Sequence, residues 1–516
     1  MKLLKHHCKK SIVRFVHVLL MIIIMAGCAQ KNNSDKSSAG KEKTNIGTAA
    51  DVILVDASKV LNDTRRRQIG INTCFFTDDD DCWFRKPVRP YNEALKELNM
   101  KYLRYPGGWK SDILFWSKPP YQKADPVLVY KGPKSWPTSD TSLVNPDGSW
   151  RIDPYDFDEF IQTCQEIQAE PVVVVCYNSC RWPLLKGYQR PTKEQVIENA
   201  VSWVRYANIE KGYDVKYWEI GNETWLDYTG IEGTTSKIPP EIYGADLFDI
   251  ATAMKAVDPD IFIGANGNTE QYWTEVLNRA ANVIDYLSVH TYPLYGWKSY
   301  DDYLTKDADP TRILKSTKKV LESNPVTRDK NIPMMMTEYA SGTFFEWDRE
   351  NANLGRAIIT FDLQGQLLQD PDCYFSQFWN TINVYEGDNS VFNALYRDNT
   401  LTSVGKSLWI WGNYLEDEML STTSSDMVRC FATRTPGETL NVFLVNRDTV
   451  AHEIRLEVLN EPGIESRGGK WTFTGISLKD QDPVWTESGN MKLRSGKIKD
   501  SLHPFSINMY SFKLSI

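Results

Sequence analysis

Short apolar segments alternate with amphipathic stretches along most of the chain, and this alternation constrains the fold more than any other feature. The apolar segments are residues 69–76, 101–106, 171–178, 215–221, 261–266, 283–290, 332–338 and 373–379. Helical periodicity marks residues 91–99, 155–169, 193–211, 245–257, 353–369 and 403–415. Eight strands separated by helices predict an α/β fold, a closed (β/α)8 barrel, which we assign to residues 50–415.

The pattern changes to a period of two after residue 415. Apolar and polar residues then alternate in 427–435, 439–448, 451–460 and 505–516, and the sequence Thr-Pro-Gly-Glu-Thr at 435–439 is typical of a hairpin turn. These features predict an antiparallel β-sandwich over residues 416–516. Residues 50–62 precede the first barrel strand and are a possible further strand of that sandwich.

The amino terminus has the features of a targeting segment. A basic stretch is followed by an apolar one that is short for a membrane span, and Ala26 and Gly27 then precede Cys28. This arrangement resembles a bacterial lipobox, which implies a signal peptide over 1–28, lipidation of Cys28 and a flexible tether over 29–49. We therefore expect a protein of the bacterial cell envelope that meets the membrane through a lipid anchor only. Simple secretion and an uncleaved anchor remain open.

Composition excludes several classes of function. The net charge is −8 and no basic patch with interleaved aromatic residues follows the leader, so nucleic acid is not expected as a partner. The histidines beyond residue 28 are His290, His452 and His503. So few histidines, and cysteines without metal-ligand spacing, indicate neither a metal site nor any other cofactor. Cys74 with Cys82, and Cys176 with Cys180, are the candidate disulfide pairs. The sequence does not predict an oligomeric state.

Two glutamates lie where barrel strands end. Glu223 follows the segment 215–221 directly, and Glu338 is the last residue of the segment 332–338. The carboxyl ends of barrel strands form the active-site face, so these two carboxylates are expected at one rim. Two carboxylates that flank one bond are what glycoside hydrolysis requires. The sequence therefore predicts a glycoside hydrolase without cofactors, whose partner is a poly- or oligosaccharide.

Each glutamate also has a purely structural interpretation. Glu223 can cap the next helix, and Glu338 can be a solvated loop residue. Three further glutamates are alternative proton donors. Of these, Glu219 falls within a strand and is expected to pair inside the barrel, whereas Glu270 and Glu346 lie in loops.

Three motifs resemble family 51 α-L-arabinofuranosidases, within the clan A glycoside hydrolases. They are Arg-Tyr-Pro-Gly-Gly at 104–108, Gly-Asn-Glu at 221–223 and His-Thr-Tyr at 290–292. The resemblance implies a retaining double displacement in which Glu223 is the acid/base and Glu338 the nucleophile. It also implies that Asn222 binds the sugar 2-hydroxyl. Arg104, His290 and Tyr292 would support the nucleophile and the sugar ring.

The chain departs from that family after residue 108. The family usually continues with Asn-Phe, whereas this chain has Trp109, Lys110 and an insertion that extends to residue 153. Long loops of this kind are usually functional. The insertion has some likeness to the β-agarase and β-porphyranase families, and its aromatic composition fits the subsites of an endo-acting cleft. Its aromatic residues are Trp109, Phe115, Trp116, Tyr121, Tyr130, Trp136 and Trp150.

Four tryptophans are the candidate platforms for sugar rings, because flat aromatic faces stack on sugars. They are Trp109, Trp116, Trp225 and Trp347. Two other classes of function stay open, a carbohydrate-binding surface lipoprotein without catalysis and a barrel enzyme of the aldolase type. The second needs a lysine or a metal cluster at a strand end, and the sequence pattern indicates neither.

Overall fold

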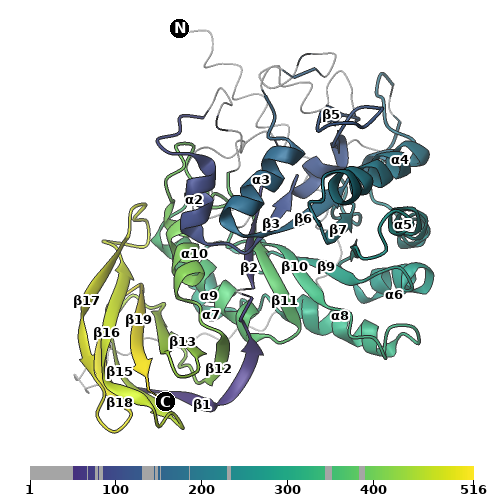
Figure 1. Ribbon diagram of the computed structural model, residues 1–516. Coiled ribbons are helices and arrows are strands. Elements are labelled where there is room, and N and C mark those ends of the chain that lie inside the picture. The colour runs from purple at the N-terminus through teal and green to yellow at the C-terminus, as the bar shows by residue number, and fades with distance from the viewer. Residues whose placement is uncertain are drawn as a thin grey trace, which may run out of the picture.

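The computed structural model consists of a barrel and a large β-sheet that packs beside it (Figure 1). The described residues are 50–515, except 67, 76–79, 81–84, 131–144, 146–148, 151–152, 185, 229–233, 343–350 and 383–389. Several predictions concern residues outside this set, namely the leader with Cys28, the tether, Cys82, Trp136, Glu346 and Trp347.

The predicted (β/α)8 barrel is confirmed. Its strands pair in the closed order β10-β11-β2-β3-β6-β7-β8-β9, and every pair is parallel. The strands are β2 (Ile69–Asn72), β3 (Tyr102–Tyr105), β6 (Glu170–Val175), β7 (Tyr217–Ile220), β8 (Phe262–Asn266), β9 (Tyr286–Thr291), β10 (Met334–Tyr339) and β11 (Cys373–Phe378). Each of them falls within one of the eight apolar segments of the sequence, apart from a single residue at one end of β6, β9 and β10.

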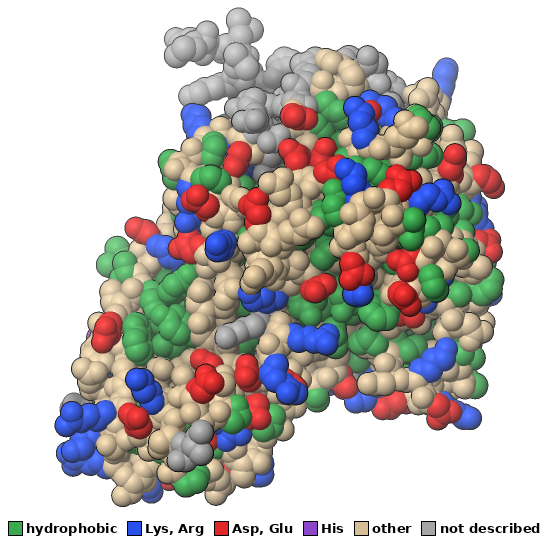
Figure 2. Space-filling model, viewed as in Figure 1, with side chains coloured by type: hydrophobic (Ala, Val, Ile, Leu, Met, Phe, Trp, Pro, Cys, Tyr) green, Lys and Arg blue, Asp and Glu red, His purple; other side chains and the backbone are tan. Residues whose placement is uncertain are grey.

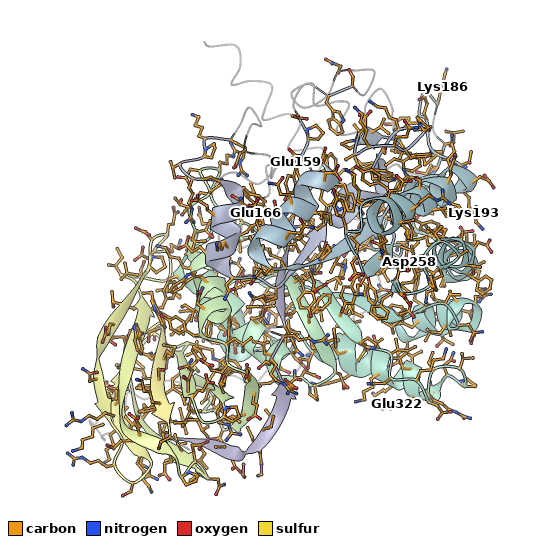
Figure 3. The ribbon with its side chains drawn as sticks, in the orientation of Figure 1. Glu159, Glu166, Lys186, Lys193, Asp258 and Glu322 are labelled. Atoms are coloured by element: carbon orange, nitrogen blue, oxygen red, sulfur yellow. The ribbon has the colours of Figure 1, made fainter. Side chains whose placement is uncertain are left out.

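Helices surround the barrel. They are α2 (Tyr91–Leu98), α3 (Phe157–Ile167), α4 (Lys193–Val204), α5 (Pro240–Lys255), α6 (Glu270–Ala280), α7 (Tyr300–Thr305), α8 (Arg312–Ser323), α9 (Leu354–Gln369) and α10 (Ser403–Tyr414). Their outer faces are polar: Glu159 and Glu166 of α3 and Glu322 of α8 are exposed (Figure 3). Capping boxes at Asp156 and Thr192 fix where α3 and α4 begin.

The barrel interior is apolar towards the amino ends of the strands and polar towards their carboxyl ends. Side chains of Tyr102, Tyr217, Tyr286 and Phe375 form an aromatic layer. Two residues further along their strands, Arg104 and Glu219 meet as a fully buried ion pair, with Arg104 Nε 3.0 Å from Glu219 Oε2. The prediction that Glu219 pairs inside the barrel is confirmed.

The carboxyl-terminal sheet has nine strands in the order β17-β16-β19-β14-β13-β12-β1-β15-β18. All neighbours are antiparallel except β1 and β15, and the sheet encloses a hydrophobic core of its own. Its strands are β1 (Asp51–Asp63), β12 (Glu418–Thr422), β13 (Val428–Thr435), β14 (Thr439–Asn446), β15 (His452–Leu459), β16 (Ile464–Thr474), β17 (Val484–Lys492), β18 (Lys497–Leu502) and β19 (Ser506–Leu514). The segment before the barrel thus pairs with the strands that follow it.

Helix α9 lies between the barrel and the sheet, where it contacts β11, β1 and β12. Most of its residues are therefore buried, including Asp362, whose Oδ2 accepts a hydrogen bond of 2.6 Å from the Tyr303 hydroxyl of α7. The guanidinium of Arg447 lies 5.2 Å from the centroid of the Tyr303 ring. Polar contacts and aromatic packing together hold the two parts against each other.

Charges of both signs are interspersed on the face shown in Figure 2. Among the described residues, none of the helices combines the length and the apolar character that a membrane span requires. The candidate disulfide between Cys176 and Cys180 is absent, because both residues are free thiols.

Candidate active site

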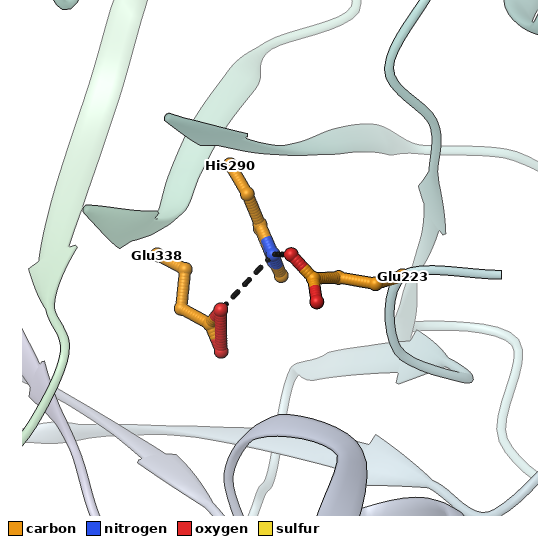
Figure 4. Close-up of side chains that lie close together, drawn as sticks. All are labelled: Glu223, His290 and Glu338. Atoms are coloured by element: carbon orange, nitrogen blue, oxygen red, sulfur yellow. Dashed lines mark hydrogen bonds and ion pairs between the residues drawn. The ribbon is translucent and has the colours of Figure 1, made fainter. Parts of the chain in front are cut away.

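Glu223, His290 and Glu338 meet at the carboxyl ends of β7, β9 and β10 (Figure 4). The imidazole lies between the two carboxylates: His290 Nδ1 is 3.0 Å from Glu223 Oε1 and 3.2 Å from Glu338 Oε2. One side-chain atom from each of the three residues lies within 4.8 Å of the other two. The two glutamates predicted at one rim are therefore neighbours in space.

Glu338 is held in the ionised form. It is 3% exposed, and its carboxylate accepts hydrogen bonds from Arg104 Nη1 at 3.4 Å and from the Tyr292 hydroxyl at 3.2 Å. Burial alone would raise the pKa of Glu338, but the charge and hydrogen bond of His290, followed by Arg104 and Tyr292, lower it below its usual range. A carboxylate that stays charged at neutral pH is what a nucleophile requires.

His290 is protonated at neutral pH. Burial alone would lower the pKa of His290, but the adjacent carboxylates of Glu338 and Glu223 raise it to about 9. Its other nitrogen, Nε2, lies 3.1 Å from Thr337 Oγ1. The imidazolium therefore acts as a fixed positive charge between two acids, which is a different situation from that of an ordinary core histidine.

Arg104 connects the barrel interior to the rim. Its Nε and Nη2 each donate a 3.0 Å hydrogen bond to Glu219, and Nη2 also donates to Asn222 Oδ1 at 2.8 Å. Nη1 donates to Asn72 Oδ1 at 2.9 Å and reaches Glu338. Arg104 is thus both a structural ion-pair partner and a contact of Glu338, because its guanidinium is a planar fork that can serve several acceptors.

The turn that carries Glu223 is sterically demanding. Gly221 has φ 71° and Glu223 has φ 43°, a conformation that costs a non-glycine residue roughly 1–3 kcal/mol. A Cβ at Gly221 would lie 2.6 Å from Asn178 Oδ1. Side-chain amides on both sides hold the turn, since Asn266 Nδ2 donates to the Gly221 carbonyl at 3.1 Å and Asn178 Nδ2 donates to the Asn222 carbonyl. These constraints account for the Gly-Asn-Glu sequence.

Tyr228 is a contact of this site that sequence reasoning missed. Its hydroxyl donates a 2.6 Å hydrogen bond to Glu223 Oε2, and Asn222 Nδ2 lies 3.4 Å from the same hydroxyl. Burial, together with the negative charge of Glu223, raises the pKa of Tyr228 well above its usual range, so the hydroxyl remains a donor. Nothing in the sequence marks this residue, because it lies in a loop beyond the strand end.

The two glycines of Arg-Tyr-Pro-Gly-Gly allow close approaches of Trp379, which follows β11, and of the Thr73 backbone. A Cβ at Gly108, which has φ 57°, would lie 2.2 Å from the Trp379 ring, and a Cβ at Gly107, which has φ 73°, would lie 2.2 Å from the Thr73 carbonyl oxygen. The buried Lys110 then places its Nζ 5.0 Å from the centroid of the same ring. The motif thus positions an aromatic ring and a cation at the rim, and the pattern of the sequence had not indicated that lysine.

Two of the candidate sugar platforms lie beside the acids. Trp109 is half-buried, with its ring centroid 6.3 Å from that of Tyr228. Trp225 is also half-buried, and its ring lies edge-on to His290 at 5.8 Å. Trp225 therefore lies next to His290, and Trp109 next to a residue that contacts Glu223; their role as sugar platforms stays a prediction.

The prediction for Trp116 is wrong. Its side chain is 1% exposed, its indole Nε1 donates to the Asn199 carbonyl at 3.2 Å, and its ring stacks on Trp203 at 6.2 Å. Phe115 and Tyr130 of the same insertion are also buried. Trp116 thus packs the insertion against α3 and α4, and Tyr130 packs on Trp182 in the loop that follows β6, so the burial of large aromatic side chains anchors this loop.

The alternative proton donors are less well placed. Both carboxylate oxygens of Glu219 accept hydrogen bonds from Arg104, and Oε1 also accepts one of 2.8 Å from the Ser288 hydroxyl. Glu270 is exposed in the first turn of α6. The cluster of Glu223, His290 and Glu338 also offers the atoms that a divalent cation needs, although His290 would first have to release its proton.

Comparisons with known proteins agree with this geometry. Residues 94–307 match the family model described as the α-L-arabinofuranosidase 1 domain. An intracellular exo-α-L-arabinofuranosidase of Bacteroides ovatus is 26% identical over 291 residues, which cover 50% of this chain and 48% of that protein. A probable α-L-arabinofuranosidase C of Aspergillus terreus is 26% identical over 245 residues, 41% of each protein. The chain thus covers less than half the length of either relative.

The crystal structure of an α-L-arabinofuranosidase from Thermotoga maritima, in complex with arabinose, superposes with a TM-score of 0.68. It is 19% identical, and the match covers 90% of this chain and 100% of the other, so the likeness establishes the fold. The chain therefore has the barrel and the paired rim carboxylates of the clan A glycoside hydrolases. Within that clan its sequence is similar to family 51, as its motifs indicate.

Proposed function

We propose that this protein is a retaining O-glycoside hydrolase in which Glu338 is the nucleophile and Glu223 the acid/base. The observation that carries the proposal is the close approach of the two carboxylates, with an atom of each within 4.8 Å of the other and of His290. Retaining enzymes place these groups about 5–5.5 Å apart, whereas inverting enzymes need about 6.5–9.5 Å to admit a water molecule.

In the first step the ionised Glu338 attacks the anomeric carbon while Glu223 gives its proton to the leaving oxygen. Arg104, His290 and Tyr292 keep Glu338 charged and correctly oriented until attack. In the second step Glu223 removes a proton from water, which attacks the glycosyl ester and restores Glu338. Asn222, which Arg104 fixes through Oδ1, presents its amide group to the sugar 2-hydroxyl.

The proposed substrate is an α-L-arabinofuranoside within plant or algal poly- or oligosaccharides. Support for this class comes from the matched family model and from the names of the similar proteins. The alternative of an endo-acting galactan hydrolase depended on the aromatic insertion, and the burial of Trp116, Phe115 and Tyr130 removes much of that basis. A barrel that only binds sugar would not need two acids bridged by an imidazolium.

A panel of aryl glycosides and polysaccharides, with products identified by mass, tests the activity and the sugar. Glu338→Ala should abolish turnover, because no glycosyl ester can form. Glu223→Ala should slow natural glycosides by about 10²–10⁴-fold and activated aryl glycosides far less, since a phenolate leaves without a proton. Glu270→Ala is the matched control, because Glu270 is exposed and should be dispensable.

A reaction with azide distinguishes a retaining from an inverting mechanism. With Glu223→Ala and an activated substrate the ester should accumulate, and azide should restore turnover as a glycosyl azide of retained configuration. An inverted azide product would assign Glu338 the role of a base. Equal loss on both kinds of substrate, with no azide response, would move the proton donor to another residue such as Glu270 or Glu346.

We also propose that Cys28 anchors the protein to the bacterial envelope through a lipid. The support is the lipobox-like sequence that ends at Cys28 and the polar composition of residues 29–49. Cys28→Ser should release the protein from the membrane fraction and leave its specific activity unchanged. Membrane association that survives the substitution would refute the anchor.

A further inference from the structure

We propose that Asp112 is a positioning residue for Glu223 and that it acts through Asn178. Asp112 lies in the 3-10 helix Gly108–Ile113, where the chain departs from the family pattern. The inference rests on the proposed function, because it assigns to this carboxyl group the orientation of the acid/base. In the described part of the structure, Asp112 makes no hydrogen bond or ion pair with Glu338 or His290.

Asp112 organises the chain at the end of β6. It is completely buried, and its Oδ1 accepts hydrogen bonds from the backbone N–H of Asn178 at 3.0 Å and of Tyr177 at 3.4 Å. Its Oδ2 is also buried and makes no hydrogen bond. Burial raises the pKa of Asp112 well above its usual range, although the backbone N–H groups of Asn178, Tyr177 and Asn222 and the charge of Arg104 act in the opposite direction.

Asn178 carries this constraint to the next strand. Its Nδ2 donates to the carbonyl of Asn222, the residue before Glu223, while its Oδ1 is buried without a partner. The only hydrogen bond that this side-chain amide makes among the described residues is therefore the one to the Asn222 carbonyl, in the turn that carries Glu223. A side chain at position 221 would collide with Asn178, so Gly221 is needed for the hydrogen bond between Asn178 and the Asn222 carbonyl.

The contact matters because Glu223 has an unfavourable backbone conformation, with φ 43°. A residue in that region persists only when its surroundings enforce it. If the Asn222 carbonyl is released, the turn can relax and the carboxyl of Glu223 moves away from the leaving oxygen. A displacement of about 1 Å at a reacting group can cost about 10²-fold in rate.

Hydrolysis of two substrates that differ in their need for a proton tests the inference. In Asp112→Ala the kcat/KM for an unactivated glycoside should fall by about 10–100-fold, and that for an activated aryl glycoside by only a few fold. Asp112→Asn should stay within a few fold of the unsubstituted enzyme on both, because its amide oxygen can still accept both N–H groups. Asn178→Ala should reproduce the selective loss.

The double variant Asp112→Ala/Asn178→Ala should be no slower than the slower single variant, because the two residues act in series. Asp362→Ala, another fully buried aspartate, is the control for general destabilisation and should affect both substrates equally. Equal losses on the two substrates, or losses that multiply in the double variant, would overturn the inference. If Asp112→Ala does not fold, the substrate comparison in Asn178→Ala decides alone.

The same experiment separates this inference from the proposed function. An unsubstituted protein that hydrolyses no glycoside on the panel overturns the function, and the positioning role with it. An active protein whose Asp112 and Asn178 variants show no preference for activated substrates overturns only the positioning role.

Discussion

Replacing His290 by glutamine is expected to remove a pH dependence of stability that the protein derives from one buried imidazole. The pKa of His290 is about 9 in the folded chain against 6.5 for a free histidine. A group whose pKa is raised by folding stabilises the fold fully below its unfolded pKa, and the contribution disappears as the pH rises through the folded value. The stabilisation that His290 contributes should therefore be lost as the pH rises from 6.5 to somewhat above 9.

The size of the effect follows from the same two values. A difference of 2.5, from 9 minus 6.5, corresponds to roughly 3 kcal/mol at about 1.4 kcal/mol for each pKa unit. Urea denaturation at intervals from pH 6 to pH 10 measures the free energy of unfolding directly. That free energy should decrease by about 3 kcal/mol more in the unsubstituted protein than in His290→Gln, which keeps a neutral donor between the carboxylates.

His452→Gln is the matched control. Burial lowers the pKa of His452, but Asp448 and Asp51 outweigh this and raise it above its usual value. It is partly exposed and lies in β15 of the sheet, outside the barrel. If the pH curves of the unsubstituted protein and His290→Gln run parallel from pH 6 to pH 10, His290 is not an imidazolium and does not hold Glu338 in the ionised form.

Four further substitutions test other parts of the structure. Glu219→Ala leaves Arg104 buried without its main partner, so the free energy of unfolding measured in urea should fall by about 3–5 kcal/mol. Tyr228→Phe removes one hydrogen bond to Glu223, about 0.5–1.5 kcal/mol, and kinetics should show a loss of up to about tenfold on unactivated glycosides. Trp116→Ala should cost about 3–5 kcal/mol of stability with KM unchanged, whereas Trp225→Ala should raise KM and leave the melting temperature unchanged.

The barrel and its two acids could be predicted because their signals are local. Each strand is a short buried run, and the barrel geometry then dictates that residues at strand ends share a rim. Glu223 and Glu338 are recognisable because an apolar run stops at a carboxylate. The ion pair of Glu219 could also be predicted, since a charge in the middle of a buried strand must find a partner.

Other features were not predictable because they depend on loop conformation and on partners distant in sequence. Trp116 and Trp109 both lie in the insertion, and only the folded loop determines that one ring packs on helices and the other lies beside Tyr228. Tyr228 contacts Glu223, and Asp112 contacts Asn178, through hydrogen bonds that no periodicity encodes. The pairing of β1 with β12 and β15 joins segments more than 350 residues apart.

The charges at the rim are compatible with the change of role that the proposed retaining mechanism asks of Glu223. Arg104 is neutralised by Glu219, and His290 as an imidazolium is neutralised by Glu338, so the cluster is balanced when Glu223 carries its proton. Formation of the glycosyl ester removes the charge of Glu338 and leaves one positive charge in excess. Loss of the proton from Glu223, which goes to the leaving group in the same step, restores the balance. The net charge of the cluster is therefore the same before and after the ester forms, although Glu223 changes its role.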